Sequence, residues 1–509
     1  MQISKLCEGG DVIKFINTDK EAEINHITND YKTAGVGSLF FAISGEKTDG
    51  NKFISKVLQS GGVAVSDSET FARNHLISGG KNLILVRDVR SAMSKIAGNF
   101  NCNPQEKLRM IMIVGTNGKT STACIIRDIF EYCGVRTGII GTLETRFEDT
   151  IYKSEMTTPD PIELFEILSS MQKLGAKAVV MEASAHAIYL KKLQNITAEI
   201  AVFTNLTQDH LDFFSDMQSY KNAKKSLFTR ENVRAAVVNA DSETGREIIS
   251  ETNTPVLSYG IENISDVFCI FSSDMQKFTD KIIKAKQDSK SDNGIKFVVN
   301  YLDEICEISS NLKGKFNAYN LLAGITTARF FGLDFENIKN AVAKIKPIAG
   351  RYQTVENNRE IEIVVDYAHT PDGMKNILEA MQCDLKSKAT IENPNPKLIT
   401  LFGCGGNRDS SKRAIMGGIA EEFSSAIVIT SDNPRFEDPQ KIAGDILCGI
   451  KTKGKAIIVL DRESAIANAI SMCNAGDSLA ILGKGHEDYI ETNGKKEHFS
   501  DIETVQKYI

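Results

Sequence analysis

The sequence feature that most restricts the possible fold is a short glycine-bearing loop between a predicted strand and a predicted helix. The apolar run Met110–Val114 predicts a buried strand, and the loop follows as Gly115–Thr120, with the sequence GTNGKT. Apolar residues at helical spacing then continue to about Cys133, and Gly134 would end the helix. In this setting the backbone N–H groups of the loop and the helix N-terminus attract phosphate. The segment therefore predicts a nucleotide-binding α/β domain.

Two side chains of this loop have a predicted chemical task. Lys119 would reach the outer phosphates of a nucleotide, and the Thr120 hydroxyl would bind Mg²⁺. The full eight-residue phosphate-loop pattern begins with Gly, where this chain has Ile113. An ordinary strand-to-helix turn with a solvated lysine is the alternative, but the order of strand, loop and helix favours nucleotide binding. The residues predicted to hold the nucleotide are Gly115, Thr116, Asn117, Gly118, Lys119, Thr120 and Ser121.

Strands and helices alternate over most of the 509 residues, a length that suggests about three domains. Asn101–Pro104 has the composition of a linker, and Lys346-Pro347 marks a second break. The sequence thus predicts domains at residues 1–104, 105–346 and 347–509. The expected fold class is α/β, with a central mononucleotide-binding domain that carries the phosphate loop and a Rossmann-like, doubly wound C-terminal domain.

The predicted strands are short apolar runs bounded by turns or helical stretches. Antiparallel hairpins are expected within residues 265–310. The remaining strands are expected at Leu39–Ile43, Gly62–Val65, Leu83–Val86, Ala178–Ala183, Glu199–Leu206, Ala235–Asn239, Ile361–Asp366, Leu398–Phe402, Ala426–Thr430, Ala456–Leu460 and Leu479–Leu482. Helices are expected at Ile162–Leu174, Met217–Phe228 and Asn317–Phe331, and near 371–382, 411–423, 438–450 and 463–473.

Composition excludes several other classes of protein. Hydrophobic residues make up 42% and charged residues 25% of the chain, the balance of a globular protein. Lys and Arg number 60 against 66 Asp and Glu, and the net charge of −6 offers no footprint for nucleic acid or an anionic membrane. No apolar run approaches the roughly 20 residues of a membrane-spanning helix, and no signal-peptide pattern is found. The ten scattered cysteines lack metal-ligand spacing and indicate reduced thiols in the cytoplasm.

Two ligating side chains are expected beyond the carboxyl ends of central strands. Glu182 follows the apolar run Ala178–Met181, and His210 comes just after the strand that ends at Leu206. In a doubly wound sheet, ligands bind beyond these strand ends, so both side chains would face the phosphate loop. A carboxylate and an imidazole there could ligate Mg²⁺. The alternatives are a helix N-cap at Asp209 and an ordinary surface histidine, and spacing alone leaves both open.

Three glycine-bearing strand ends of the third domain indicate a second site. They lie at 403–408 (GCGGNR), 431–435 (SDNPR) and 483–487 (GKGHE). Arginine holds a carboxylate through two parallel hydrogen bonds and glutamate holds an ammonium, so two arginines with a glutamate suit a zwitterion.

Four further positions have both a structural and a functional interpretation. Asn320, one turn into the helix that Asn317 would cap, could bond a base edge. Arg351 could reach a phosphate across the domain boundary. Asp366 ends a strand just before a helix that begins with proline. Lys224 belongs to a basic run with two neighbouring lysines, and such a run is typical of a solvated helix face.

Together and in this order, these motifs resemble those of the Mur ligases, ATP-dependent amide-bond enzymes of peptidoglycan synthesis. The resemblance covers nearly the whole chain. The Asp-Asn-Pro-Arg form at 432–435 resembles members that add meso-diaminopimelate, whereas lysine-adding members usually lack the arginine. With lysine as the amino acid, the guanidinium groups of Arg408 and Arg435 would be left buried and unmatched, so the resemblance implies a preference for meso-diaminopimelate of about a hundred- to several-thousandfold. The motifs that carry the resemblance are Gly115–Thr120, Thr157-Thr158-Pro159, Met181–Ser184, Asp209–Asp212, Gly314–Asn320, Asp366–Pro371, Asp432–Arg435 and Gly483–Asp488.

The resemblance implies roles that spacing alone does not assign. The implied catalytic residues are Lys119, Glu182, His210, Arg351 and Lys224, the last carrying a carbamate. Mg²⁺ would be held by Thr120, Glu182, His210 and the modified Lys224, and ATP by the phosphate loop with Asn320 and Asp366. The UDP-linked substrate would contact Tyr31, Thr157, Thr158, Ser184 and Lys192. The amino acid would contact Arg408, Asp432, Asn433, Pro434, Arg435, Gly483 and Glu487.

Two of these positions depart from the family's usual residues. The family usually has Asp-Ser-Arg where this chain has Asp30-Tyr31-Lys32, and an arginine is common where it has Lys192. A lysine cannot reproduce the bidentate phosphate contact of an arginine.

The implied reaction is the ATP-dependent addition of meso-diaminopimelate to UDP-N-acetylmuramoyl-L-alanyl-D-glutamate through an acyl phosphate. The expected enzyme is a cytoplasmic monomer without a nucleic acid or membrane partner. One alternative is a related ligase with another acceptor, such as L-lysine or a folyl-polyglutamate, although a folate enzyme would lack the first domain. The other is a non-catalytic nucleotide-binding protein, against which the intact Lys119, Glu182, His210 and Lys224 argue.

Overall fold

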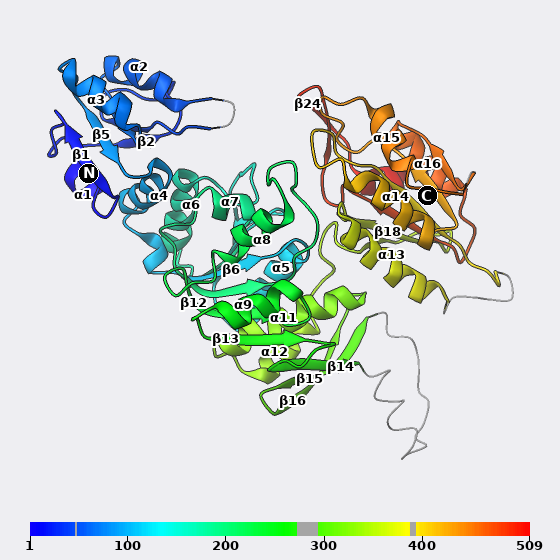
Figure 1. The fold of residues 1–509 in the computed structure, drawn as a ribbon. Coiled ribbons are helices and arrows are strands. Elements are labelled where there is room, and N and C mark those ends of the chain that lie inside the picture. Colours follow the sequence, from blue (N-terminus) through cyan, green and yellow to red (C-terminus); the bar gives the residue numbers. More distant parts are fainter. Residues whose placement is uncertain (46–47, 272–293, 387–392, 453) are drawn as a thin grey trace.

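The computed structural model describes residues 1–45, 48–271, 294–386, 393–452 and 454–509. Its strands form three large sheets that follow one another along the chain, and one two-stranded hairpin. In Figure 1 the sheet with the N-terminus and the sheet with the C-terminus lie on either side of the central sheet. Most neighbouring strands run parallel and helices connect them, which confirms the predicted α/β class.

The first sheet has five strands in the order β1-β5-β4-β3-β2. Strands β2 to β5 pair in parallel, and β1 pairs antiparallel with β5 at one edge. The three predicted strands correspond to the fully buried β3, β4 and β5. The two edge strands were missed, because β1 is partly exposed and β2 is only three residues long. The strands are β1 (Val12–Ile16), β2 (His26–Thr28), β3 (Ser38–Phe41), β4 (Val63–Ser66) and β5 (Leu83–Val86); the helices are α1 (Ile3–Leu6), α2 (Ile54–Gln59), α3 (Glu69–Ile77) and α4 (Val89–Phe100).

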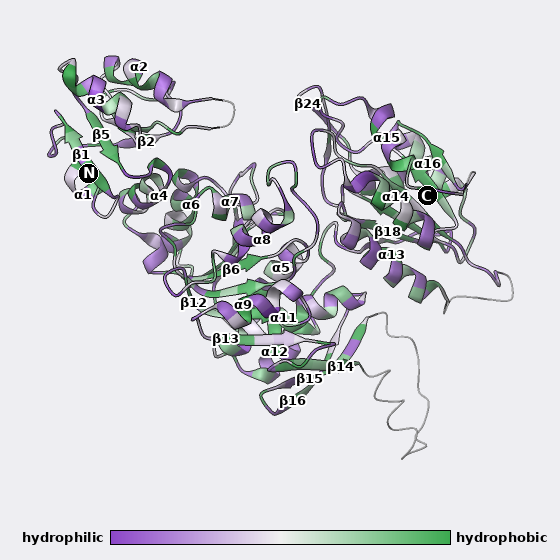
Figure 2. Ribbon diagram, viewed as in Figure 1, coloured by the Kyte–Doolittle hydropathy of each residue, from purple (hydrophilic) through white to green (hydrophobic). Residues whose placement is uncertain are grey.

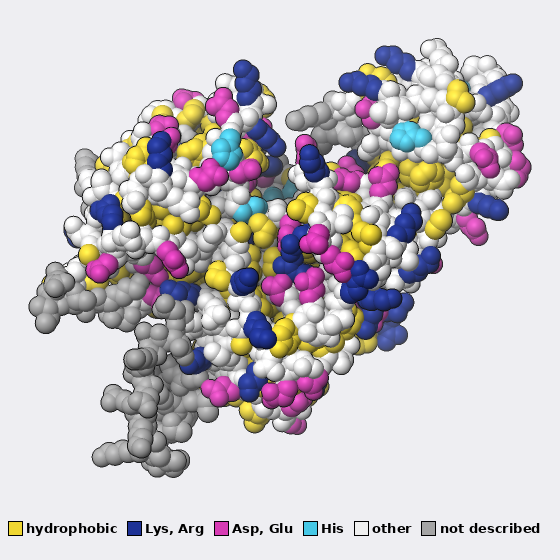
Figure 3. Space-filling model, turned by 180° about the vertical axis from the view of Figure 1, so that it is seen from behind, with side chains coloured by type: hydrophobic (Ala, Val, Ile, Leu, Met, Phe, Trp, Pro, Cys, Tyr) yellow, Lys and Arg dark blue, Asp and Glu magenta, His cyan; other side chains and the backbone are white. Residues whose placement is uncertain are grey.

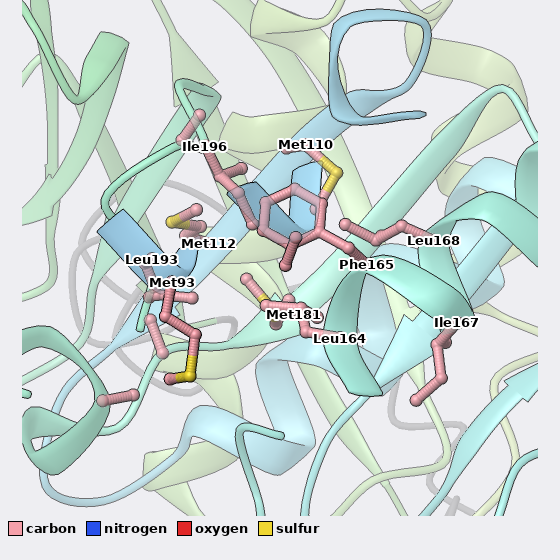
Figure 4. Packing of buried hydrophobic residues seen from close by; sticks show 14 of the residues in the cluster. Met93, Met110, Met112, Leu164, Phe165, Ile167, Leu168, Met181, Leu193 and Ile196 are labelled. Atoms are coloured by element: carbon pink, nitrogen blue, oxygen red, sulfur yellow. The ribbon is translucent and has the colours of Figure 1, made fainter. Parts of the chain in front are cut away.

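Helix α4 joins this sheet to the central part of the molecule. Its Met93 belongs to the same buried cluster as Met110 and Phe165 of the central part. Figure 4 shows the Phe165 ring beside Met110, with Met181 below it and Met93 near Leu193. Burial of apolar surface stabilises by about 25 cal/mol per Å². The apolar core is therefore continuous across the linker region near residue 104.

The central sheet has eleven strands in the order β16-β15-β14-β13-β12-β11-β6-β10-β7-β8-β9. Strand β6, which precedes the phosphate loop, pairs in parallel with β10 and β11. The runs predicted from residues 110, 178, 199 and 235 are confirmed as β6, β10, β11 and β12, while β7, β8, β9 and β13 were not predicted. The strands are β6 (Arg109–Val114), β7 (Thr137–Ile140), β8 (Thr145–Phe147), β9 (Thr150–Ile151), β10 (Ala178–Glu182), β11 (Ala198–Phe203), β12 (Val233–Asn239) and β13 (Val256–Gly260).

Strands β14 (Val267–Phe271), β15 (Ile295–Tyr301) and β16 (Glu304–Ser310) complete this sheet at its far edge. β15 pairs antiparallel with both neighbours, which confirms the hairpins expected within 265–310; residues 272–293 lie outside the described residues. The helices of this part are α5 (Lys119–Tyr132), α6 (Pro161–Lys173), α7 (Ala185–Tyr189), α8 (Met217–Lys225), α9 (Glu243–Glu251), α11 (Lys315–Phe330) and α12 (Phe335–Val342).

One helix start differs from its prediction. Helix α11 begins after Gly314, whose φ is +84°, and not after Asn317. The Asn317 side chain lies inside the first turn and donates to the Lys313 carbonyl at 2.8 Å. The capping role expected of Asn317 is therefore wrong.

The third sheet has the order β17-β18-β22-β19-β20-β21, and all neighbours pair in parallel except β17 and β18. The five predicted strands are confirmed as β18 to β22, and the four helices as α13 to α16. Strand β17, the hairpin β23–β24 and the last helix were missed. The strands are β17 (Gln353–Val355), β18 (Glu362–Asp366), β19 (Leu398–Phe402), β20 (Ala426–Ile429), β21 (Ala456–Ile458), β22 (Ser478–Leu482), β23 (Tyr489–Thr492) and β24 (Lys495–His498); the helices are α13 (Pro371–Lys386), α14 (Lys412–Phe423), α15 (Pro439–Leu447), α16 (Arg462–Ser471) and α17 (Asp501–Tyr508).

Polar and apolar residues are distributed as expected for packed layers. Figure 2 shows apolar colouring concentrated on strands such as β6, with polar colouring on the outward sides of many helices. Among the described residues, no helix is both long and apolar enough to span a bilayer. All ten cysteines are described, and each is a free thiol.

Candidate active site

The phosphate loop lies between β6 and α5, as predicted, and its two glycines are required by close neighbours. A Cβ at Gly115 would lie 1.8 Å from Thr204 Oγ1, and one at Gly118 would lie 2.6 Å from Asn320 Oδ1. Gly118 also has a φ of +83°, which disfavours other residues. The end of β11 and the side chain of Asn320 on α11 are thus packed directly against the loop.

Lys119 folds back over the loop. Its Nζ donates to the carbonyls of Gly115 at 3.1 Å and Thr116 at 2.9 Å. Burial lowers the pKa of Lys119, and the nearby Glu182 and Asp209 partly oppose that shift. Since both hydrogen bonds go to neutral oxygens, the ammonium can exchange them for the oxygens of a phosphate.

Glu182 is 1% exposed and ends β10. Thr142 donates to its two carboxylate oxygens, through N–H at 2.8 Å and through Oγ1 at 3.1 Å. Thr157 Oγ1 lies 3.0 Å from Thr142 Oγ1, and Thr158 Oγ1 donates to the Glu182 carbonyl at 2.8 Å. The Ser184 N–H donates to Thr158 Oγ1 at 3.1 Å. The structure thus brings the three hydroxyls predicted to contact substrate together with the predicted metal ligand.

His210 and Asp209 lie on the loop after β11. His210 has a φ of +57°, and its Nε2 is 3.4 Å from Asp209 Oδ2. Burial lowers the pKa of His210 to about 3, so the imidazole is neutral and can offer a lone pair to a metal. Asp209 is not a helix cap, because Asp216 caps α8. Asp209 instead binds Lys412 Nζ at 3.2 Å and lies 3.6 Å from His369 Nε2, both in the third domain.

Lys224 points inward from α8 and is 1% exposed. Its Nζ donates to Thr116 Oγ1 at 3.0 Å and lies 4.2 Å from the centre of the Tyr220 ring. Burial holds its pKa well below the usual value, and the nearby Lys119 lowers it further. The neighbouring Lys225 pairs with glutamates at the surface instead. The solvated-face interpretation is therefore wrong for Lys224, whose amine lies buried beside the phosphate loop.

The phosphate loop is also bonded to the third domain. Asn117 Nδ2 donates to Asp372 Oδ2 at 2.8 Å, and Thr370 Oγ1 donates to Asn117 Oδ1 at 3.1 Å. Arg351 Nη2 donates to Thr120 Oγ1 at 3.0 Å, as expected of a residue that reaches across the boundary. In the view of Figure 3 the molecule is hollowed between its lobes, and histidine, acidic and basic side chains gather there.

The other residues predicted to hold the nucleotide are buried close to the loop or at the domain boundary. Ser121 lies in the first turn of α5. Asn320 accepts from Thr122 Oγ1 at 3.2 Å and donates to Asn317 Oδ1 at 3.0 Å. Asp366 accepts two backbone N–H groups, at 2.6 and 2.7 Å, while burial raises its pKa. Asp366 thus has both carboxylate oxygens engaged in shaping the start of the third domain.

Arg435 is held by the unpredicted hairpin β23–β24. Its N–H donates to the Glu491 carbonyl at 3.0 Å, and its carbonyl accepts from Asn493 at 2.7 Å. The guanidinium Nε lies 3.2 Å from Glu491 Oε2, and Nη1 donates to the Gly406 carbonyl at 3.0 Å. Arg435 is therefore paired within the protein.

Asn433 and Glu487 meet across two strand ends. Asn433 Nδ2 donates to Glu487 Oε2 at 2.9 Å. Lys484, which was not predicted as a site residue, donates to Asn433 Oδ1 at 3.2 Å and lies 3.3 Å from Glu487 Oε2. Gly483, with a φ of +109°, allows Asp432 to approach, since a Cβ there would lie 2.7 Å from Asp432 Oδ2. Together with Arg435, these predicted residues form one cluster, here called the amino-acid cluster. The buried Lys484 lies beneath it.

Arg408 lies beside this cluster, at the boundary with the second domain. Its side chain is 52% exposed, and Nη1 is 3.4 Å from Asp212 Oδ2. Pro434 packs so closely on Gly406 that a Cβ at Gly406 would lie 1.9 Å from the proline carbonyl oxygen. The expectation of two buried, unmatched arginines is wrong, because each arginine already has a carboxylate partner.

Tyr31 and Lys192 lie apart from the phosphate loop, in a pocket of about 270 Å³ lined by the first and second domains. Tyr31 stacks on Phe53, with ring centres 4.1 Å apart and planes 4° apart. Lys192 Nζ is 2.8 Å from Asp160 Oδ1. Arg90 also lines this pocket and was not predicted, because an arginine in the first turn of a helix carries no local signal.

The sequence of the chain is similar to known protein families and to individual known proteins. Residues 113–328 match the Mur ligase middle domain, and residues 350–485 match the Mur ligase, glutamate ligase domain. The UDP-N-acetylmuramoyl-L-alanyl-D-glutamate--2,6-diaminopimelate ligase of Aquifex aeolicus is 38% identical over 96% of this chain and 94% of its own length. The ligase of the same name from Caldanaerobacter subterraneus is 36% identical over 97% of this chain and 96% of its own length.

Solved structures agree with these matches. A UDP-N-acetylmuramoyl-L-alanyl-D-glutamate--2,6-diaminopimelate ligase, 28% identical, covers 100% of this chain and 98% of its own with a TM-score of 0.66. A MurF ligase of Thermotoga maritima in complex with ADP, 16% identical, covers 95% of this chain and 96% of its own with a TM-score of 0.58. The second likeness concerns the fold alone.

Proposed function

The chain belongs to the Mur ligase family of ATP-dependent, amide-bond-forming enzymes, and from this we propose that it joins meso-diaminopimelate to UDP-N-acetylmuramoyl-L-alanyl-D-glutamate. The near full-length relatives carry the name of this ligase. The single structural observation that supports it most is the contact between the phosphate loop and the third domain. Asn117 and Thr120 of the phosphate loop bond Asp372 and Arg351 of the domain that carries the amino-acid cluster.

The reaction needs two steps because a carboxylate is a poor electrophile. In the first, a carboxylate oxygen of the D-glutamyl residue attacks the γ-phosphorus of ATP, and ADP leaves. In the second, the amine of the amino acid attacks the acyl carbon, loses a proton and expels inorganic phosphate. The acyl phosphate formed between these steps reacts with water, so the reaction requires a closed site.

Lys119, Arg351 and the loop N–H groups are the groups of this chain that suit phosphoryl transfer. Lys119 and Arg351 now donate to neutral oxygens at 2.9 to 3.1 Å, and each can exchange these partners for a phosphate oxygen. They would stabilise the negative charge that spreads over the transferred group. Thr157, Thr158 and Ser184, beside Glu182, would orient the carboxylate that attacks.

The donor set near Lys119 fits Mg²⁺, although no cluster of three His, Cys, Asp or Glu residues occurs among the described residues. Glu182 and Thr120 offer oxygen, His210 a neutral nitrogen, and nucleotide phosphates would complete the shell. When bound, Mg²⁺ would neutralise phosphate charge during transfer. Lys224 would contribute a further oxygen ligand as a carbamate, which forms when its neutral amine attacks the carbon of CO₂ and loses a proton. The depressed pKa of Lys224 supports this modification.

The acceptor and the UDP-linked substrate would bind at the two flanking domains. Arg435, with Arg408 nearby, would take the second carboxylate of meso-diaminopimelate, and Glu487 would take an ammonium. Tyr31 and Lys192 would contact the UDP-linked substrate in the pocket of about 270 Å³. We place the reaction in the cytoplasm, where ATP is available, with a monomer as the active form and without nucleic acid or membrane partners.

The test is phosphate release together with the mass of the product. Release is expected only when ATP, the UDP-linked dipeptide and meso-diaminopimelate are all present, with one new amide bond in the product. A panel of other amino acids serves as the control. Nucleotide binding without phosphate release under these conditions would favour the non-catalytic alternative.

A further inference from the structure

Lys484 lies beneath the amino-acid cluster and has no exposed surface. Lysine is almost never fully buried unless it is paired. Its Nζ lies 3.3 Å from one carboxylate oxygen, Glu487 Oε2, and donates to Asn433 Oδ1 at 3.2 Å. We propose that Lys484 is a positioning residue for the amino-acid substrate, acting through Glu487 and Asn433. This inference rests on the proposed function.

The first consequence concerns the orientation of the Asn433 amide. Its Oδ1 accepts from Lys484 Nζ and from the Glu491 N–H at 2.9 Å. Two donors on one oxygen fix the amide so that Nδ2 faces Glu487 Oε2, at 2.9 Å. One N–H of that amide then remains for the substrate.

The second consequence concerns which oxygen of Glu487 is available. Lys484 and Asn433 both engage Oε2, whereas among the described residues Oε1 has only the long contact of 3.4 Å from the Tyr367 hydroxyl. A carboxylate with one oxygen fixed presents the other in a defined direction. Oε1 of Glu487 is therefore prepared to accept an ammonium of the amino acid.

The third consequence concerns charge. Lys484 and Arg435 balance Glu487 and Glu491, each basic group being 3.2 or 3.3 Å from its acidic partner. Basic groups that are already paired with carboxylates suit meso-diaminopimelate, whose two ammonium groups balance its two carboxylates. Without Lys484, the partly buried Glu487 carboxylate would lose its basic partner and keep only neutral donors.

The test compares Lys484→Met with the control Lys496→Met. Both lysines lie near the ring of Tyr489, but Lys496, 4.5 Å from the ring centre, is exposed. Lys484→Met should raise the KM for meso-diaminopimelate at least about tenfold. This is the change expected when one charge-assisted hydrogen bond is lost. The KM values for ATP and the UDP-linked dipeptide should change less than about twofold. Lys496→Met should behave as the wild type.

A double-mutant cycle separates positioning from a structural role. In a Glu487→Gln background, Lys484→Met should cost clearly less than in the wild type, because the carboxylate, one of the two groups through which Lys484 acts, is gone. The inference would be overturned by equal losses in both backgrounds or by parallel changes in all three KM values. It would also be overturned if both Lys484→Met and Lys484→Gln failed to fold. A wild-type enzyme that does not use meso-diaminopimelate would instead refute the proposed function.

Discussion

The phosphate site and the amino-acid cluster satisfy their charges in opposite ways. At the phosphate site, Lys119 and Arg351 donate to carbonyl and hydroxyl oxygens, all neutral partners. In the amino-acid cluster, Arg435 is paired with Glu491 and Lys484 with Glu487. The basic groups of the phosphate site thus have neutral partners, whereas those of the amino-acid cluster already have carboxylate partners.

This difference matches the charges of the two ligands. A triphosphate brings several negative charges, so a site with positive charge and neutral oxygen partners gains strong electrostatic attraction when it binds. A zwitterion brings both signs and binds by exchanging partners within an existing network. We therefore expect large losses from changes at the phosphate site and smaller, substrate-specific losses from changes in the amino-acid cluster.

The largest effect is expected for Lys119→Ala. It removes a phosphate partner without opening the core, so turnover should fall by about a hundredfold or more while the melting temperature is kept. Steady-state phosphate release and thermal unfolding measure the two quantities. Lys173→Ala, an exposed lysine on α6, is the matched control. Wild-type turnover in folded Lys119→Ala would refute the assignment of the loop.

A similarly large loss is expected for Lys224→Ala, with partial recovery. The carbamate proposed on Lys224 is an anion, so a short carboxylate such as acetate or formate should restore part of the activity. Lys225→Ala, next in the chain but paired with surface glutamates, should remain active. An intact-protein mass with the adduct supports the modification, and full activity of Lys224→Ala would contradict it.

Arg435→Ala should have an intermediate effect that depends on the acceptor. Loss of one charge-assisted contact, about 1.5–3 kcal/mol, should lower kcat/KM for meso-diaminopimelate roughly tenfold to a hundredfold. L-Lysine lacks the second carboxylate, so its kcat/KM should hardly change. The measurement is phosphate release with each acceptor, and equal losses for both would show that Arg435 only shapes a turn.

Glu491→Gln should have the smallest effect. It removes the carboxylate 3.2 Å from Arg435 Nε but keeps a side chain of the same shape. The KM for meso-diaminopimelate should change only severalfold, since the amide oxygen of Gln can still accept a hydrogen bond from Arg435 Nε. Glu497→Gln, exposed on β24, is the control. A loss as large as that of Arg435→Ala would mean that Glu491 itself contacts the substrate.

The sequence predicts best what is local. The phosphate loop, its flanking strand and helix, and the buried strands of the third sheet follow from short apolar runs and glycine positions. Lys224 was assigned only through the resemblance, because its burial depends on the packing of α8 against the loop.

Contacts between residues far apart in the chain could not be predicted in the same way. Asp209 binds Lys412 and Asn117 binds Asp372 across a domain boundary, and neither spacing nor hydropathy carries that information. The hairpin that holds Arg435 was missed because β24 is fully exposed and polar. The pairing of Arg435 with Glu491, which corrects the expected selectivity, follows from that hairpin.

The ratio of kcat/KM for meso-diaminopimelate to that for L-lysine on the wild-type enzyme tests the central claim most directly. Arg435 is paired with Glu491, and Arg408 is half exposed. Binding of L-lysine would therefore not leave a buried, unmatched guanidinium. The ratio should therefore reflect one charge-assisted contact and lie between roughly tenfold and a hundredfold in favour of meso-diaminopimelate. Equal efficiency with the two acceptors would contradict the assignment of the amino-acid cluster.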